Sequence, residues 1–161
     1  MDGQRLLAIY LNDHLLGASG GVDLFERAAG AARGTPAGPA LERLAVQVAE
    51  DRRALLAVMR RLGVRVRYYK VAVGWTLEKL ARVKTNGRLV SRSPLSDLVE
   101  LEGLRLGVQG KEAGWLALAA VADRYDALDR AELECLAERA RSQAEELEQL
   151  RIGVAARVLC P

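Results

Sequence analysis

The chain has 161 residues, of which 50% are hydrophobic and 28% are charged, and its formal net charge is +3. A chain of this length and apolar content can bury its own core, which excludes a disordered or collagen-like protein. No apolar run approaches the ~20 residues that a helix needs to cross a bilayer. We therefore expect a single helical domain over residues 1–161, without a transmembrane segment.

The cysteine pattern bears on the cellular compartment. Cys135 and Cys160 are the two cysteines, too few for a disulfide framework and too far apart for a Cys-x-x-Cys metal or redox motif. The first five residues do not resemble a secretory signal. We expect reduced thiols in a cytoplasmic protein.

Apolar residues in the first third of the chain recur at spacings of three, four or seven, which is typical of amphipathic helices. The first stripe predicts a helix over 3–32. Glycines and prolines over 34–39 interrupt it, and Pro39 suits the first turn of a second helix. The second stripe predicts a helix that ends at Gly63.

Two further helices are predicted in the second half of the chain. Ser93 suits an N-cap and Pro94 a first helical turn, and the helix that they open is expected to run to about Tyr125. Asp129 and Glu132 form a variant of the capping box. The apolar stripe after them predicts a fourth long helix.

About 30 residues connect the second helix to the third. The spacing of Tyr69, Val73 and Leu77 predicts a short helix over 68–84 within this connection. A connection of this length can return the chain along the bundle, so that the second and third helices run parallel. The sequence therefore predicts an all-α four-helix bundle with one long crossover.

Five short motifs, spread over nearly the whole chain, carry a family resemblance: Tyr10-Leu11-Asn12-Asp13-His14-Leu15, Glu50-Asp51-Arg52, Lys84-Thr85-Asn86-Gly87-Arg88, Ser93-Pro94-Leu95-Ser96 and Glu100-Leu101-Glu102. In these motifs the chain resembles the ferritin-like superfamily, and more closely an uncharacterised bacterial branch of it. The resemblance implies a bundle with one crossover. For the wider superfamily it also implies a carboxylate-bridged centre of two iron or two manganese ions.

The residues that such a centre requires are missing. It needs a Glu from each of two helices and a Glu-x-x-His motif from each of the other two. The chain has one histidine, His14, and Leu11 stands three residues before it. Arginine, which has no lone pair for a metal, follows the glutamates instead. We predict no di-metal centre and no cofactor, and an all-carboxylate site for a harder ion remains an alternative.

Two levels of polar residues are expected inside the bundle. Asp51 lies 12 residues past Pro39, and Arg105 lies 11 residues past Pro94. Both fall on apolar stripes, and parallel helices would place them at similar depth. We expect an Asp51–Arg105 ion pair, with Glu102 as a further member; alternatively, both side chains reach solvent at the stripe edge.

The second level contains His14, Glu112 and Gln143, which share a depth to within about one turn. Burial of such groups is costly unless they bond to one another. We expect a hydrogen-bonded trio in preference to a weak metal or ligand pocket.

Glycines crowd two of the predicted helices. A phosphate-binding loop is not favoured, because no Gly-Lys-Ser/Thr motif follows and no strand precedes them. A close helix crossing through small side chains is favoured. The glycines are Gly17, Gly20, Gly21, Gly103, Gly107, Gly110 and Gly114.

The crossover carries a strong excess of positive charge, with Glu78 as its one acidic residue over 65–93 and three aromatic residues among the basic ones. Such a segment can bind nucleic acid, an anionic membrane surface or an acidic protein. Pairing with acidic helices of this chain or of a partner subunit is favoured. The candidates for anion contact are Arg65, Arg67, Lys70, Arg82, Lys84, Arg88 and Arg92.

No catalytic constellation is visible, because any Ser-His-Asp or Cys-His system would have to use His14. We expect a non-enzymatic protein that acts through binding or assembly, as a homodimer. Two alternatives remain. One is an iron or manganese oxidoreductase, or a metal-handling protein, with a carboxylate site. The other is an anion-binding module that uses the crossover.

Overall fold

In the computed structural model, the described residues are 3–67 and 94–160, and within these ranges the chain is helical with no strand. This confirms the all-α prediction for that part of the chain. The predicted helix over 68–84 and the predicted cap at Ser93 lie outside the described residues. The elements are α1 (Gly3–Ala31), α2 (Gly38–Arg61), α4 (Pro94–Ala120), the 3-10 turn η1 (Ala122–Arg124) and α5 (Arg130–Leu159).

The link between α1 and α2 has the chemistry that its glycines and prolines predict. Gly34 adopts a left-handed backbone (φ 77°), which costs a glycine little. The Thr35 hydroxyl donates to the carbonyl of Ala32 at 2.7 Å. Gly38 passes so close to that carbonyl that a Cβ would lie 2.7 Å from its oxygen. Pro39 stands in the first turn of α2, as predicted.

The end of α2 is a Schellman motif, which confirms Gly63 as its stop. Gly63 has φ 66°, and its N–H donates to the carbonyl of Arg60 at 3.1 Å. The N–H of Val64 donates to the carbonyl of Met59 at 2.9 Å. These two bonds satisfy carbonyls that have no partner inside the helix.

The third helix is shorter than expected. We predicted that it runs to about Tyr125, but α4 ends at Ala120 and η1 follows. Ala122 and Leu128 in this link are both buried, so the chain turns early and packs its link against the core. Asp129 then caps α5, because its carboxylate accepts from the N–H groups of Ala131 and Glu132.

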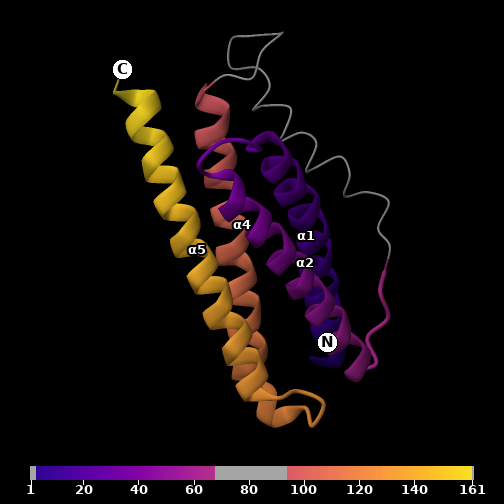
Figure 1. Ribbon diagram of the computed structural model, residues 1–161. Helices are drawn as coiled ribbons and strands as arrows, with labels where there is room; N and C mark the ends of the chain where they lie inside the picture. Colours follow the sequence, from indigo (N-terminus) through magenta and orange to yellow (C-terminus); the bar gives the residue numbers. More distant parts are fainter. Residues whose placement is uncertain (1–2, 68–93, 161) are drawn as a thin grey trace.

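The helices form two antiparallel pairs, α1 with α2 and α4 with α5, and α1 also packs against α4 (Figure 1). In Figure 1, α2 and α4 run in the same direction, as the long connection predicts. The carboxyl end of α2 and the amino end of α4 therefore lie at opposite ends of the bundle.

The core lies between these pairs, and leucine is its most frequent residue. The largest apolar side chains that are fully buried are Leu11, Leu44, Met59, Leu104, Leu118, Leu133 and Leu147.

None of the helices in residues 3–67 and 94–160 combines the length and apolarity that crossing a bilayer requires.

Candidate functional site

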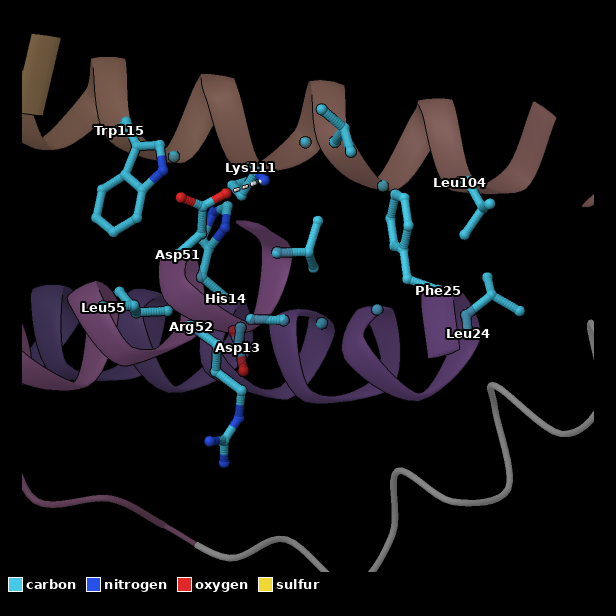
Figure 2. Close-up of a pocket in the computed structure, with 18 of the residues that line it drawn as sticks. Asp13, His14, Leu24, Phe25, Asp51, Arg52, Leu55, Leu104, Lys111 and Trp115 are labelled. Carbon is cyan, nitrogen blue, oxygen red and sulfur yellow. Dashed lines mark hydrogen bonds and ion pairs between the residues drawn. The ribbon is translucent and has the colours of Figure 1, made fainter. Parts of the chain in front are cut away.

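A buried carboxylate joins three helices in the middle of the bundle. Asp51 of α2 is 2% exposed. It forms ion pairs with Lys111 of α4 and with Arg139 of α5, one through each carboxylate oxygen. Figure 2 shows the Lys111 contact as a dashed line. Removal of a carboxylate from water is costly unless cations compensate it, and here two of them do.

Gln143 of α5 completes this ion cluster. Its amide oxygen accepts from Lys111 Nζ at 2.5 Å, and its amide nitrogen donates to Asp51 Oδ2 at 3.2 Å and to Gln47 Oε1 at 3.0 Å. An amide suits this position because it offers an acceptor to the cation and donors to the oxygens. We call Asp51, Lys111, Arg139 and Gln143 the ion cluster.

The surroundings perturb the Lys111 ammonium. Burial lowers the pKa of Lys111 below its usual value, the charge of Asp51 raises it partly back, and Arg139 lowers it further. Burial is the largest of these effects, and the charge of Asp51 offsets part of it.

The predicted Asp51–Arg105 pair is wrong. Arg105 Nε lies 3.1 Å from Glu148 of α5, and Glu102 pairs with Arg151 at 3.7 Å. The cation that meets Asp51 stands six residues further along α4, which corresponds to about 9 Å of helix. The prediction assumed that α2 and α4 begin level, whereas packing displaces one along the other.

The predicted trio of His14, Glu112 and Gln143 is also wrong. Glu112 accepts from Arg141 Nε at 3.1 Å, and Gln143 belongs to the ion cluster. His14 lies against Tyr10, with ring centroids 4.5 Å apart, and against Gly114. Glu112 follows Lys111 directly, so it points about 100° away from it around the helix, toward α5.

A cavity of about 470 Å³ lies between α1, α2 and α4, beside the ion cluster (Figure 2). Its walls combine glycine backbone with the side chains of large apolar residues. Asp13 and His14 from α1, Asp51 and Arg52 from α2 and Lys111 from α4 supply the charged or titratable groups, together with Tyr10. The apolar residues include Leu11, Leu24, Phe25, Val48, Leu55, Leu104, Val108, Trp115 and Leu118.

The glycines line this cavity and do not form the predicted close crossing. A Cβ at Gly17, Gly21, Gly103, Gly107 or Gly110 would meet no atom within 4 Å. The exception is Gly114, where a Cβ would meet the imidazole of His14 at 2.8 Å. Small residues thus leave space between α1 and α4 that ordinary side chains would fill.

The polar groups around the cavity respond to partial burial. Burial lowers the pKa of His14, and the nearby charge of Asp13 partly opposes this effect. Burial also raises the pKa of Tyr10. Near neutral pH, both rings are therefore uncharged.

A hydrogen bond beside the cavity links α2 to α1, because Arg52 donates from Nε to the Ser19 hydroxyl at 2.9 Å.

Several of the acidic residues are partners of arginines. Within residues 3–67 and 94–160, no three side chains of His, Cys, Asp or Glu are grouped as a metal ion would require. Two of the Glu-x-x-Arg sequences form ion pairs within α5, Glu138 with Arg141 and Glu148 with Arg151, both at 2.7 Å.

Most of the basic crossover lies outside the described residues, including its candidates Lys70, Arg82, Lys84, Arg88 and Arg92. Arg65 and Arg67 are exposed. The amide of Asn12 in α1, which is buried, accepts from the Arg67 N–H at 2.6 Å and donates to the Arg65 carbonyl at 3.1 Å. Asn12 therefore fixes the start of the crossover against α1.

Sequence reasoning missed Lys111 and Arg139, and it did not favour a cavity. A signal for Lys111 was present, because it lies three residues after Val108 and four before Trp115, both of which are buried. This spacing places Lys111 on the apolar stripe of α4. Arg139 is a third exposed and carries no comparable signal.

Comparison with known proteins adds no assignment. The chain matches no family model, and neither the curated proteins nor the solved structures include one similar enough to count as a match. The ferritin-like resemblance therefore remains a prediction from the sequence, and the function is inferred from the site.

Proposed function

We propose that this protein is a non-enzymatic binding protein that holds a small apolar molecule in the cavity between α1 and α4. The observation that carries the proposal is the cavity itself. Its volume of about 470 Å³ falls within the ~300–1,000 Å³ typical of small-molecule sites. Mostly apolar walls with a few polar groups are also typical of such sites.

The ion cluster supports this function by holding the cavity open. Asp51, Lys111 and Arg139 link α2, α4 and α5 on one side of the cavity. We propose that the bundle is ferritin-like and that this cluster takes the place of the di-metal centre. Support comes from the parallel course of α2 and α4 and from the neutralisation of a central carboxylate by fixed cations.

The proposal includes a homodimer in the cytoplasm. Large apolar side chains on the outer faces of the helices, such as Leu106 (66% exposed) and Ile152 (51% exposed), support assembly with a second copy. The exposed, unpaired thiols of Cys135 and Cys160 support a reducing compartment. Sedimentation equilibrium tests the dimer, and a monomer at all concentrations would contradict it.

Binding can be tested with aminoanthracene, an apolar probe whose fluorescence rises away from water. Gly103, Gly107, Gly110 and Gly114 share one face of α4, which the His14 contact of Gly114 shows to be turned toward α1. Gly107→Leu should therefore fill the cavity and weaken probe binding at least about tenfold. Gly30→Leu is the matched control, because Gly30 is an exposed helical glycine outside the cavity.

Both leucine variants should retain the helical circular dichroism of the parent, since leucine is a better helix former than glycine. Equal probe affinity in Gly107→Leu and the parent would overturn the cavity as the binding site.

Metal analysis of protein purified without added metal distinguishes the proposed binding function from the alternative metal-dependent function. Stoichiometric iron or manganese would favour a carboxylate oxidoreductase or metal-handling protein.

A further inference from the structure

One buried donor in the cavity wall has no partner. Trp115 of α4 is 3% exposed, and its Nε1–H makes no hydrogen bond within the described part of the chain. Trp115 lines the cavity, and Figure 2 shows the nitrogen edge of its indole on the side of Lys111 and Asp51. Buried donors in native proteins are almost always satisfied, so an unsatisfied one beside a cavity indicates a missing acceptor.

Lys111 supplies a second donor. An ammonium has three N–H groups and no acceptor. Two of the three are used by Asp51 and Gln143, and the side chain is 15% exposed. Both oxygens of Asp51 are already engaged, because one receives Arg139 and the other receives Lys111 and Gln143. On the Asp51 side the cavity therefore offers donors, and the acceptors left in its wall belong to other residues, among them the unprotonated ring nitrogen of His14.

The charges of the cavity wall balance. Asp13 and Asp51 are matched by Arg52 and Lys111, and the lowered pKa of His14 keeps its ring neutral near pH 7. A charged ligand would lose hydration without finding a net opposite charge in this wall. The donors and the balanced charge together favour an uncharged ligand that carries an acceptor.

The glycines define the shape of the ligand. Gly17 and Gly21 on α1 and Gly103, Gly107 and Gly110 on α4 line the space, and none has an atom within 4 Å of its Cβ position. Glycine permits a ligand to approach the backbone closely. Such walls suit the faces of a flat ring system better than a branched chain.

We propose that the cavity binds a flat, uncharged, apolar carbonyl compound whose oxygen accepts hydrogen bonds from Trp115 Nε1 and Lys111 Nζ. This rests on the proposed function and specifies its ligand class. The carbonyl oxygen has two lone pairs, one for each donor, and the ring system replaces water along the apolar and glycine-lined walls.

Fluorenone and fluorene form a matched pair of probes, because they share one flat ring framework. Fluorenone carries a carbonyl group where fluorene carries a methylene group. Their affinities are measured by displacement of aminoanthracene. We expect fluorenone to bind about tenfold more tightly than fluorene, which is the scale of one well-made hydrogen bond. Bound fluorenone should also show its infrared carbonyl stretch at lower wavenumber than in hexane.

Trp115→Phe removes the donor and keeps an aromatic ring. It should lower the affinity for fluorenone more than the affinity for fluorene, while the Lys111 donor remains. Because Trp115 is buried, its variant is compared with the parent by circular dichroism. The infrared shift in the unaltered protein gives a reading that does not depend on the variant.

The outcomes separate this inference from the proposed function. Equal binding of the two probes with no infrared shift would overturn the carbonyl assignment and leave an apolar binding protein. Tighter binding of fluorene carboxylate than of fluorenone would overturn the preference for an uncharged ligand. Binding of none of the probes, including aminoanthracene, would overturn the proposed function and the inference together.

Discussion

Gly114 of α4 lies directly against the imidazole of His14 of α1. A Cβ at position 114 would stand 2.8 Å from Cε1 and 2.9 Å from Nδ1 of that ring. This is the one close approach between the glycines of α4 and a side chain of α1, and it fixes the position of the histidine beside the cavity. The addition of one methyl group at position 114 therefore tests the position of the His14 ring.

Gly114→Ala should displace the imidazole toward water. Because burial is the main cause of the lowered His14 pKa, displacement should raise this pKa toward its ordinary value of 6.5. The chain has one histidine, so its ring resonances in an NMR titration are unambiguous. Gly110→Ala, where a Cβ meets nothing, is the control and should leave the pKa unchanged. Identical titrations of both variants and the parent would contradict the contact.

His14 should also make stability depend on pH. Its folded-state pKa lies below 6.5, so the unfolded chain binds more protons in the window between the two values. The His14 contribution is therefore fully present above pH 6.5 and is lost as pH falls through the folded-state pKa. The urea midpoint measured against pH should show this loss, and His14→Gln should remove it.

Asp13→Asn should shift the pKa of His14 in the opposite direction from Gly114→Ala. The charge of Asp13 raises the pKa of His14 against the effect of burial, so removal of the charge should lower the pKa further. A histidine titration that moves upward in Asp13→Asn would show that another group controls this ring.

Asp51→Asn should destabilise the fold by about 3 kcal/mol, because it leaves Lys111 buried without its counter-charge. Arg139 is a third exposed and can turn toward water, so most of the loss falls on Lys111. Urea unfolding measures the change. The double variant Asp51→Asn with Lys111→Met also lacks the unpaired cation. It should therefore recover much of the stability that Asp51→Asn loses.

The control for the ion cluster is a surface pair between the same helices α2 and α5. Arg43 and Glu146 lie 2.6 Å apart with exposed fractions of 60% and 34%. Glu146→Gln should cost less than about 1 kcal/mol, as is usual for exposed pairs. Equal losses in Asp51→Asn and Glu146→Gln would show that the ion cluster is not a buried network.

Gly63→Ala should destabilise the end of α2 by about 1–2 kcal/mol, because an L-residue is strained in the left-handed conformation that Gly63 adopts. Gly30→Ala, within α1 and without a close neighbour, should instead stabilise the protein by up to ~1 kcal/mol. Thermal unfolding of the two variants should therefore shift in opposite directions. A gain in Gly63→Ala would contradict the Schellman assignment.

The sequence by itself determined the features that depend on neighbours along the chain. The stop at Gly63, the cap at Asp129 and the place of Asp51 on an apolar stripe all follow from local geometry, because 3.6 residues per turn fix which side chains share a face. The parallel course of α2 and α4 follows from the length of their connection. The sequence did not predict that α4 ends at Ala120, because the buried residues of the following link, Ala122 and Leu128, show no helical periodicity.

Only the tertiary structure decided which side chains meet across helices. Asp51 meets Lys111 and not Arg105, since packing sets how far one helix is displaced along its neighbour, and about 9 Å is enough to exchange one cation for another. Glu112 and Lys111 are adjacent in sequence, yet Glu112 pairs with Arg141 of α5 whereas Lys111 reaches Asp51 of α2 as well as Gln143 of α5. The glycines marked where α1 and α4 carry small side chains, and only the distance between the two helices decided that a cavity lies there.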